Sequence, residues 1–200
     1  MKVNETNAIP YEGKLALQQL MDTAYAQAAR SFSLLVNQEI DASSSRFAAS
    51  KMSIRTDMYY REESLSLVVT DIEGGMNGRS YLLLSEQERA VVQETCLPAI
   101  KDIERRTVME EAFIKEIDNI VSAAMITVLS ETLDVHMFGG VPRLLNASLA
   151  GIQETLQKDF MADHSHEYLL ISSTFVFKEH SQLRPQFFWK LPSEFLQYLK

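Results

Sequence analysis

The chain has 200 residues, of which 46% are hydrophobic and 23% are charged, a composition typical of a globular protein with a hydrophobic core. This length is enough for one large domain or two small ones. The formal net charge of −8 argues against sequence-independent binding of nucleic acid, which depends on clustered lysine and arginine side chains.

Nothing in the sequence predicts export or insertion into a membrane. Residues 1–6 contain no apolar signal core, and the apolar run at 123–129 is interrupted by Thr127 and soon followed by Ser130. Cys96 is the single cysteine, which excludes an internal disulfide and fits a reducing compartment. We therefore expect a cytoplasmic protein without a membrane partner, in which Cys96 is a buried thiol with no chemical role.

The first half of the chain has the pattern of a helix, a β-hairpin and a second helix. The expected elements, in order, are a helix over 13–36, strands over 64–72 and 80–84, and a helix over 86–97. The glycine-rich run at 74–78 predicts the hairpin turn. Ser85 followed by Glu88 is a capping-box sequence, which marks the start of the second helix.

The second half repeats this order. The expected elements are a helix over 109–133, a short helix near 149–160, strands over 168–178 and 187–191, and a last short helix that begins at Pro192. Aligning Leu17 with Ile114 pairs the two long helices. We interpret the chain as a single domain, residues 1–200, built from two pseudo-repeats over about 13–105 and 106–200. The expected fold class is α+β, with both hairpins joined into one antiparallel sheet and the long helices packed on it.

The helix over 109–133 carries a carboxylate and a carboxamide one turn apart. Glu116 and Asn119 are three residues apart, which places both side chains on the same face of the helix. The rest of this helix is strongly apolar, so packing alone does not account for two polar groups on one stripe. Pro142 follows and completes the pattern Glu-x-x-Asn-x22-Pro.

This pattern, inside a duplicated helix–hairpin–helix unit, resembles the CheC/CheX/FliY family of response-regulator phosphatases. The resemblance covers nearly the whole chain. It implies a CheC-like fold and hydrolysis of the phosphoryl-aspartate on a CheY-like receiver domain, in chemotaxis or another two-component signalling pathway. It also implies that Glu116 and Asn119 are the catalytic pair and that Pro142 shapes the chain after the site helix. No cofactor of the chain's own is implied, because Mg²⁺ would be bound by the receiver.

Two departures from the family pattern narrow this expectation. Ala112 stands four residues before Glu116, where the family usually has Asp or Ser. In the first half, the residues aligned with Ala112, Glu116, Asn119 and Pro142 are Leu15, Gln19, Asp22 and Ser45. We therefore expect one working site, in the second half, and a degenerate first half.

The two polar side chains suit different roles in the hydrolysis of an acyl phosphate, which needs a positioned water and stabilised charge on the phosphoryl oxygens. Asn119 is no base near neutral pH, but its carboxamide can hold a water by donating one hydrogen bond and accepting another. Glu116 is suited to an ion pair with the receiver's lysine, which would fix the depth and register of docking.

Small residues beside the pair favour a docking surface. Ala112 and Ala123 lie on the same stripe of the helix and would let a partner backbone approach closely. Together with Pro142 they are the expected partner-docking residues. Lys115 and Asp118 are expected to point away from this stripe into solvent.

Other interpretations of the sequence stay open. A non-catalytic adaptor that binds a receiver or a flagellar-switch protein fits Ala112 and the degenerate first half, and exposed strand edges could pair two chains into a homodimer. No metal site is expected, because His164 and His166 have no third ligand at a plausible spacing and are expected in a polar loop.

Overall fold

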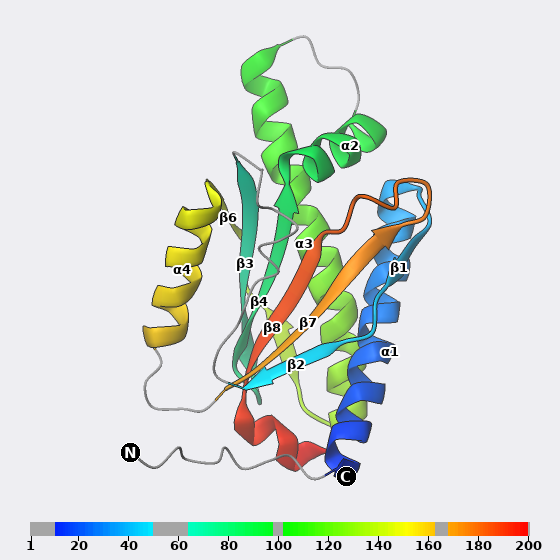
Figure 1. Cartoon of the computed structure of the whole chain (residues 1–200), viewed down its shortest axis with the longest axis vertical. Coiled ribbons are helices and arrows are strands. Elements are labelled where there is room, and N and C mark those ends of the chain that lie inside the picture. The colour runs from blue at the N-terminus through cyan, green and yellow to red at the C-terminus, as the bar shows by residue number, and fades with distance from the viewer. Residues whose placement is uncertain (1–10, 50–63, 98–101, 163–167, 200) are drawn as a thin grey trace.

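The computed structural model describes residues 11–49, 64–97, 102–162 and 168–199 of the chain (Figure 1). In chain order the elements are α1 (Tyr11–Val36), β1 (Ile40–Ala42), β2 (Arg46–Ala49), β3 (Leu65–Gly74), β4 (Gly78–Ser85), α2 (Glu86–Cys96), α3 (Ile103–Leu133), β5 (Met137–Gly139), β6 (Arg143–Ala147), α4 (Leu149–Ala162), β7 (Tyr168–Phe177), β8 (Gln186–Pro192) and the 3₁₀ helix η2 (Ser193–Tyr198). The polar loop expected around His164 and His166 lies outside the described residues.

The strands form one antiparallel sheet whose centre is shared by the two halves of the chain. Its order is β1-β7-β8-β4-β3-β5, with β2 also paired to β7 and β6 also paired to β3. The hairpins β3–β4 and β7–β8 join through β4 and β8, where Ser80 is opposite Trp189 and Leu82 is opposite Phe187. The expected α+β class, with both hairpins in a single sheet, is therefore confirmed.

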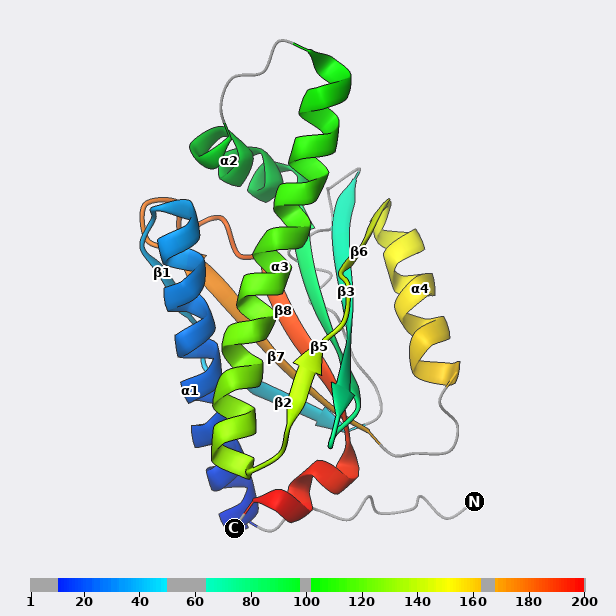
Figure 2. The same cartoon turned by 180° about the vertical axis from the view of Figure 1, so that it is seen from behind.

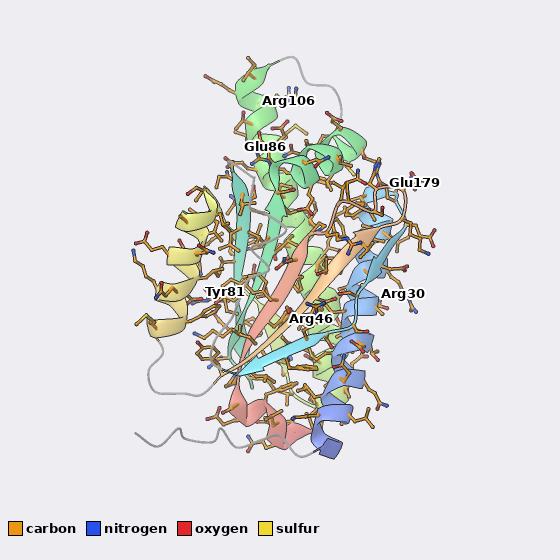
Figure 3. All side chains as sticks on the ribbon, in the orientation of Figure 1. Arg30, Arg46, Tyr81, Glu86, Arg106 and Glu179 are labelled. Carbon is orange, nitrogen blue, oxygen red and sulfur yellow. The ribbon has the colours of Figure 1, made fainter. Side chains whose placement is uncertain are left out.

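Helices cover both faces of this sheet. α1 and α3 lie side by side on one face, and α4 covers part of the other (Figures 1 and 2). Because side chains alternate along a strand, Leu82 and Leu84 of β4 enter the core beneath α1 and α3, while Tyr81 and Leu83 enter a second cluster with residues of α4. Tyr81, labelled in Figure 3, lies between the sheet and α4, with its ring packed against Phe160.

Local signals in the sequence set the ends of several elements. Ser85 and Glu88 form the expected capping box of α2: Glu88 N donates to Ser85 Oγ over 3.1 Å, and Ser85 N donates to Glu88 Oε2 over 2.7 Å. In the β3–β4 turn Gly74 has a φ of +118°, and a Cβ atom there would come within 2.4 Å of His136 O. Glycine is therefore required at this position of the turn.

The site helix α3 is longer than the sequence pattern indicates. It begins at Ile103 rather than near residue 109, because Asp102 caps it by accepting a hydrogen bond from Arg105 N over 3.0 Å. It ends at Leu133, as expected, where Asp134 takes the left-handed conformation with a φ of 54°. None of the described helices is both long and apolar enough to cross a membrane.

Four short strands at the two sides of the sheet are not expected from the sequence. β1 and β2 pair with β7, and β5 and β6 pair with β3. β1 and β5 have 3 residues each, β2 has 4 and β6 has 5, too few for an alternating pattern to stand out. They matter for function because the turn between β5 and β6 contains Pro142.

Candidate functional site

α3 presents a polar pair on its solvent face. Glu116 and Asn119 are both exposed one turn apart, while Ile117 and Val121 on the other side of the helix are fully buried. Within the described part of the chain, neither polar side chain forms a hydrogen bond or an ion pair. Both groups are therefore available to a partner.

The expected docking residues lie beside this pair or after its helix. Ala112 and Ala123 are exposed on α3, with no long side chain to keep a partner at a distance. Pro142 is half-buried in the turn between β5 and β6. The exposure of the two alanines is compatible with docking, and contact of Ala112, Ala123 and Pro142 with a partner stays a prediction.

The turn that contains Pro142 is tied to β3 through Asp71. Gly140 N donates to Asp71 O over 2.8 Å, and Arg143 Nη1 lies 2.6 Å from Asp71 Oδ2. Arg79 Nε lies 2.6 Å from Asp71 Oδ1. Burial by itself raises the pKa of Asp71, but hydrogen bonds from Arg143 and Arg79 and their charges outweigh it, so the net pKa is lowered. The carboxylate is therefore charged at neutral pH and anchors the turn.

Asp118 does not point into solvent, so that part of the sequence interpretation was wrong. Its side chain is fully buried between α3 and the sheet, where Oδ2 accepts a hydrogen bond from Thr70 Oγ1 over 2.5 Å. Burial raises the pKa of Asp118 to about 7, although the hydrogen bond from Thr70 lowers it. Lys115 is half-buried rather than fully solvated. Helical geometry explains the burial of Asp118, which lies one turn after the buried Ile114.

A second buried polar contact lies one turn further along α3. Ser122 Oγ and Ser80 Oγ are 3.1 Å apart. Thr70 and Ser80 are directly opposite each other in the β3–β4 hairpin, so Asp118 and Ser122 meet a matched pair of hydroxyls on the sheet. All four side chains are buried. We refer to Asp118, Ser122, Thr70 and Ser80 as the polar clasp.

The aligned positions in the first half are arranged differently. Asp22 Oδ1 accepts hydrogen bonds from Ser45 N over 2.7 Å and from Ser45 Oγ over 2.8 Å, and Asp22 Oδ2 accepts one from Gln18 Nε2 over 2.9 Å. Gln19 is exposed. Because Asp22 is bonded within the chain, the aligned positions Gln19 and Asp22 of α1 form no free polar pair like the one on α3. The expectation of a single site stays a prediction.

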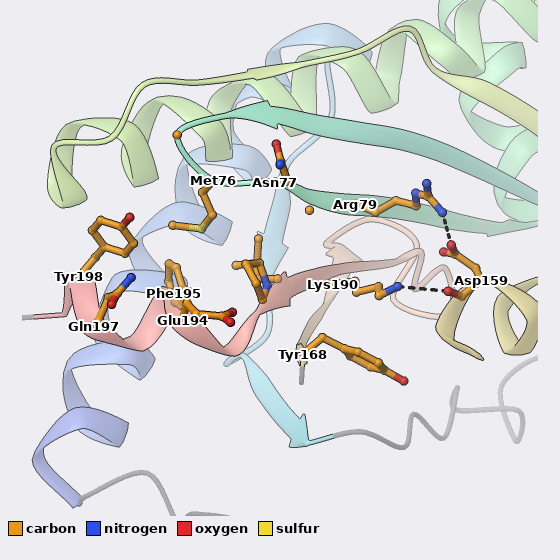
Figure 4. A pocket seen from close by; sticks show the side chains of 14 residues that line it. Met76, Asn77, Arg79, Asp159, Tyr168, Lys190, Glu194, Phe195, Gln197 and Tyr198 are labelled. Carbon is orange, nitrogen blue, oxygen red and sulfur yellow. Dashed lines mark hydrogen bonds and ion pairs between the residues drawn. The ribbon is translucent and has the colours of Figure 1, made fainter. Parts of the chain in front are cut away.

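A pocket elsewhere on the molecule is not expected from the sequence. It has a volume of about 670 Å³ and lies between the β3–β4 turn, the end of β8 and η2 (Figure 4). On one side of it, Lys190 Nζ donates to Asp159 O over 3.1 Å, and Arg79 pairs with the Asp159 carboxylate. Since Arg79 also pairs with Asp71, its charge is neutralised within the chain. Neither residue of the polar pair on α3 lines this pocket.

Neither Cys96 nor the two histidines that the structure describes, His136 and His180, form an alternative site. Cys96 is half-buried rather than buried, with Sγ 3.9 Å from Leu35 O, and burial raises the pKa of its thiol, which disfavours the reactive thiolate. In the described part of the chain, no group of three or more His, Cys, Asp and Glu side chains is placed to bind a metal ion. The exposed pair on α3 is therefore the candidate site.

Comparison with known proteins identifies the fold. No protein-family model and no curated protein sequence matches the chain. FliY from Thermotoga maritima matches with a TM-score of 0.64 and 13% identity over 96% of both chains. A chain of the CheX–CheY–BeF3–Mg²⁺ complex from Borrelia burgdorferi matches with a TM-score of 0.59 and 14% identity over 86% of this chain and 97% of that one. A chain of the FliG–FliM complex from H. pylori matches with a TM-score of 0.60 and 9% identity over 94% of this chain and 100% of that one. The chain therefore has the fold of the CheC/CheX/FliY type.

Proposed function

We propose that this chain hydrolyses the phosphoryl-aspartate of a CheY-like receiver domain by inserting Glu116 and Asn119 into the receiver's active site. The observation that carries the proposal is the exposure of both side chains, without partners in the described part of the chain, on one face of a helix that packs on the sheet. The likeness in fold to a chain of the CheX–CheY–BeF3–Mg²⁺ complex supports a receiver as the partner. The roles of the two side chains follow from their chemistry.

The reaction converts an acyl phosphate into a carboxylate and inorganic phosphate. A water oxygen bonds to phosphorus while the bond between phosphorus and the aspartyl oxygen breaks, and the protons of the water pass to the phosphate and the solvent. Because an acyl phosphate is already activated, hydrolysis needs mainly a positioned water and stabilised charge. Asn119 would orient the water in line with the breaking bond, through one donated and one accepted hydrogen bond. The receiver would contribute Mg²⁺, which neutralises charge on the phosphoryl oxygens.

Glu116 is assigned to docking. Its carboxylate lies one turn before Asn119, so it can meet a lysine of the receiver while Asn119 approaches the phosphoryl group. Docking would remove this ion pair from water, and a desolvated ion pair affects binding more than an exposed one does. Ala112 and Ala123 leave room for the receiver backbone on either side of the pair.

Replacement of Asn119 by alanine tests the water-positioning role. We expect Asn119→Ala to bind the phosphorylated receiver as tightly as the unsubstituted protein, but to lose on the order of a hundredfold of the acceleration of hydrolysis. The measurement is the half-life of the phosphorylated cognate receiver with each variant. Gln19→Ala, at the exposed aligned position of α1, is the matched control and should behave like the unsubstituted protein. If Asn119→Ala shortens the half-life equally well, the assigned role is wrong.

Charge reversal at Glu116 tests the docking role. Glu116→Lys would face the receiver's lysine with a like charge, so the affinity for the phosphorylated receiver should fall by about tenfold or more. The affinity is measured by titration with fluorescently labelled receiver. Glu111→Lys, an exposed charge reversal on another side of α3, is the control and should change the affinity much less. An affinity that Glu116→Lys leaves unchanged would rule out this role.

A non-catalytic adaptor is the second candidate function. It is favoured by Ala112, which stands where the family pattern usually has Asp or Ser, and by the likeness in fold to a chain of the FliG–FliM complex. An adaptor would bind the receiver, or a flagellar-switch protein, without shortening the life of the phosphoryl group. The half-life experiment with the unsubstituted protein therefore separates the two candidates.

A further inference from the structure

We propose that Asp118 is a positioning residue, whose buried side chain fixes the rotation of α3 that turns Glu116 and Asn119 outward, and whose loss of a proton disturbs that arrangement. The inference rests on the proposed function, because it assigns a positioning role to the inner side of the same helix. The polar clasp carries the proposal.

The clasp joins α3 to the sheet at two points. Asp118 Oδ2 accepts a hydrogen bond from Thr70 Oγ1 over 2.5 Å, and Ser122 Oγ lies 3.1 Å from Ser80 Oγ. Thr70 and Ser80 are opposite each other on neighbouring strands, while Asp118 and Ser122 are one helical turn apart. Two directional contacts at this spacing oppose both rotation and sliding of the helix. Apolar packing alone is non-directional and fixes the position of the helix less specifically.

Rotation of α3 decides where the polar pair points. Successive residues of an α-helix are rotated by about 100°, so Asn119 points about 100° away from Asp118 and Glu116 about 160° away from it. With Asp118 held against Thr70, the two side chains must face solvent, as they do. Asn119 directly follows Asp118, so any shift of Asp118 moves the carboxamide that would hold the water.

The surroundings of Asp118 favour its neutral form. The exposed fraction of Asp118 is 0%, and within the described part of the chain Oδ1 has no hydrogen-bond partner. A buried carboxylate with one donor lacks the partners that a charge needs in an apolar interior. Ionisation would therefore favour entry of water or a shift of the helix, and either would disturb the clasp.

Among the described residues, no charged side chain takes the place of the missing partner at Asp118 Oδ1. Titratable side chains on the elements packed against α3 have other partners: Asp22 with Ser45, Tyr25 with the carbonyl oxygens of Ile171 and Phe187, Glu88 with Ser85, Arg79 with Asp71 and Asp159, Tyr81 with Asp159, Arg89 with Ser66, and Arg143 with Asp71. Lys14, Arg30, Glu73, Glu86 and Glu94 on the same elements are exposed, whereas Asp118 is fully buried. β5 contributes no titratable residue. Burial is accordingly the main cause of the raised pKa of Asp118, and the hydrogen bond from Thr70 is the opposing one.

The pH dependence of hydrolysis tests the inference with Asp118→Asn, which keeps an acceptor for Thr70 but cannot ionise. At saturating receiver, the rate with the unsubstituted protein, divided by the rate with Asp118→Asn, should fall about tenfold from pH 6 to pH 8.5, since small displacements of a positioning group have large effects. Division by the variant rate removes the receiver's own pH dependence. Asp134→Asn, the same change at the exposed C-cap of α3, should give the profile of the unsubstituted protein. A constant ratio would overturn the inference.

A measurement without a receiver separates this inference from the proposed function. In the protein alone, the ¹³C resonance of the Asp118 carboxyl and the side-chain amide resonances of Asn119 should shift together as the pH crosses neutrality. Asp118→Asn should abolish the shift of Asn119. Separate titrations, or no change at Asn119, would overturn the positioning role even if the chain is a phosphatase. Failure of the proposed function would appear instead as an unchanged receiver half-life, with the coupled titration intact.

Discussion

At the scale of single residues, the buried Asp118 makes the stability of the protein depend on pH. The pKa of Asp118 is raised from 3.8 to about 7 by burial, so between these values the folded state holds a proton that the unfolded state has lost. The free energy of unfolding therefore falls as the pH rises through this window, by about 2.5 kcal/mol between pH 5 and pH 8 from this residue.

Urea denaturation at pH 5 and pH 8 checks this prediction. Asp118→Asn cannot ionise, so its stability should change less between the two pH values than that of the unsubstituted protein, and the difference isolates Asp118. Equal changes in the two proteins would show that Asp118 is ionised at both pH values.

A second prediction at this scale concerns Asp22, the residue of the first half that is aligned with Asn119. Asp22 accepts hydrogen bonds from the backbone and hydroxyl of Ser45, whereas the aligned Pro142 has no N–H to donate to Asn119. Asp22 on α1 therefore has a structural role, whereas Asn119 on α3 has no partner within the described part of the chain. Asp22→Ala should therefore destabilise the protein by about 2 kcal/mol, with no effect on the receiver half-life per folded molecule. Thermal unfolding and the half-life assay measure the two effects, and a specific loss of hydrolysis would give Asp22 a functional role.

At the scale of elements, the exposed stripe of α3 should act as a docking surface with little tolerance for bulk. Ala123→Trp would place a large side chain beside Asn119 and should weaken receiver binding at least about tenfold, while stability changes by about 0.5 kcal/mol or less because the position is exposed. Ala26→Trp is the matched control, since Ala26 is the exposed aligned residue of α1. Similar losses of receiver affinity in both variants would point to a general effect rather than to docking on α3.

The elements also show what sequence patterns can predict. The long helices and both hairpins were predicted because their apolar periodicity extends over many residues, and the capping box at Ser85 marked the start of α2 correctly. The short side strands were missed because they carry no periodic signal. The burial of Asp118 was missed for another reason: its position relative to Ile114 placed it on the buried side of α3, but its charge suggested solvent. At this position helical periodicity predicted burial better than the type of residue did.

The residues of the site illustrate the same limit. Glu116 and Asn119 were predicted from their spacing together with the resemblance to the CheC/CheX/FliY pattern, and both are exposed as expected. The polar clasp behind them, by contrast, requires Thr70 and Ser80 to be opposite each other on two strands. Strand register is a long-range property that depends on the turn and on the packing of the hairpin. The supporting contacts of a site are therefore harder to predict from sequence than the groups that it exposes.

At the scale of the whole molecule, the two halves share one core and should not fold separately. β4 of the first half pairs with β8 of the second, α1 packs against α3, and Leu82 and Phe187 belong to the same buried cluster. Either half alone would expose the apolar sides of its long helix and its hairpin, and would lose the central strand pairing. We therefore expect residues 1–101 and 102–200, expressed separately, to lack cooperative unfolding transitions, because burial of apolar surface is the main favourable contribution to folding.

Co-expression of the two fragments provides the positive arm of this experiment. Together they should form a complex with the circular dichroism spectrum of the intact chain, and that complex should shorten the receiver half-life, because α3 would again be held by the sheet. Cooperative unfolding of an isolated fragment would instead show two independent domains and contradict the single-domain interpretation. Asn119→Ala in the second fragment distinguishes recovered hydrolysis from mere association, since that complex should assemble but leave the phosphoryl group intact.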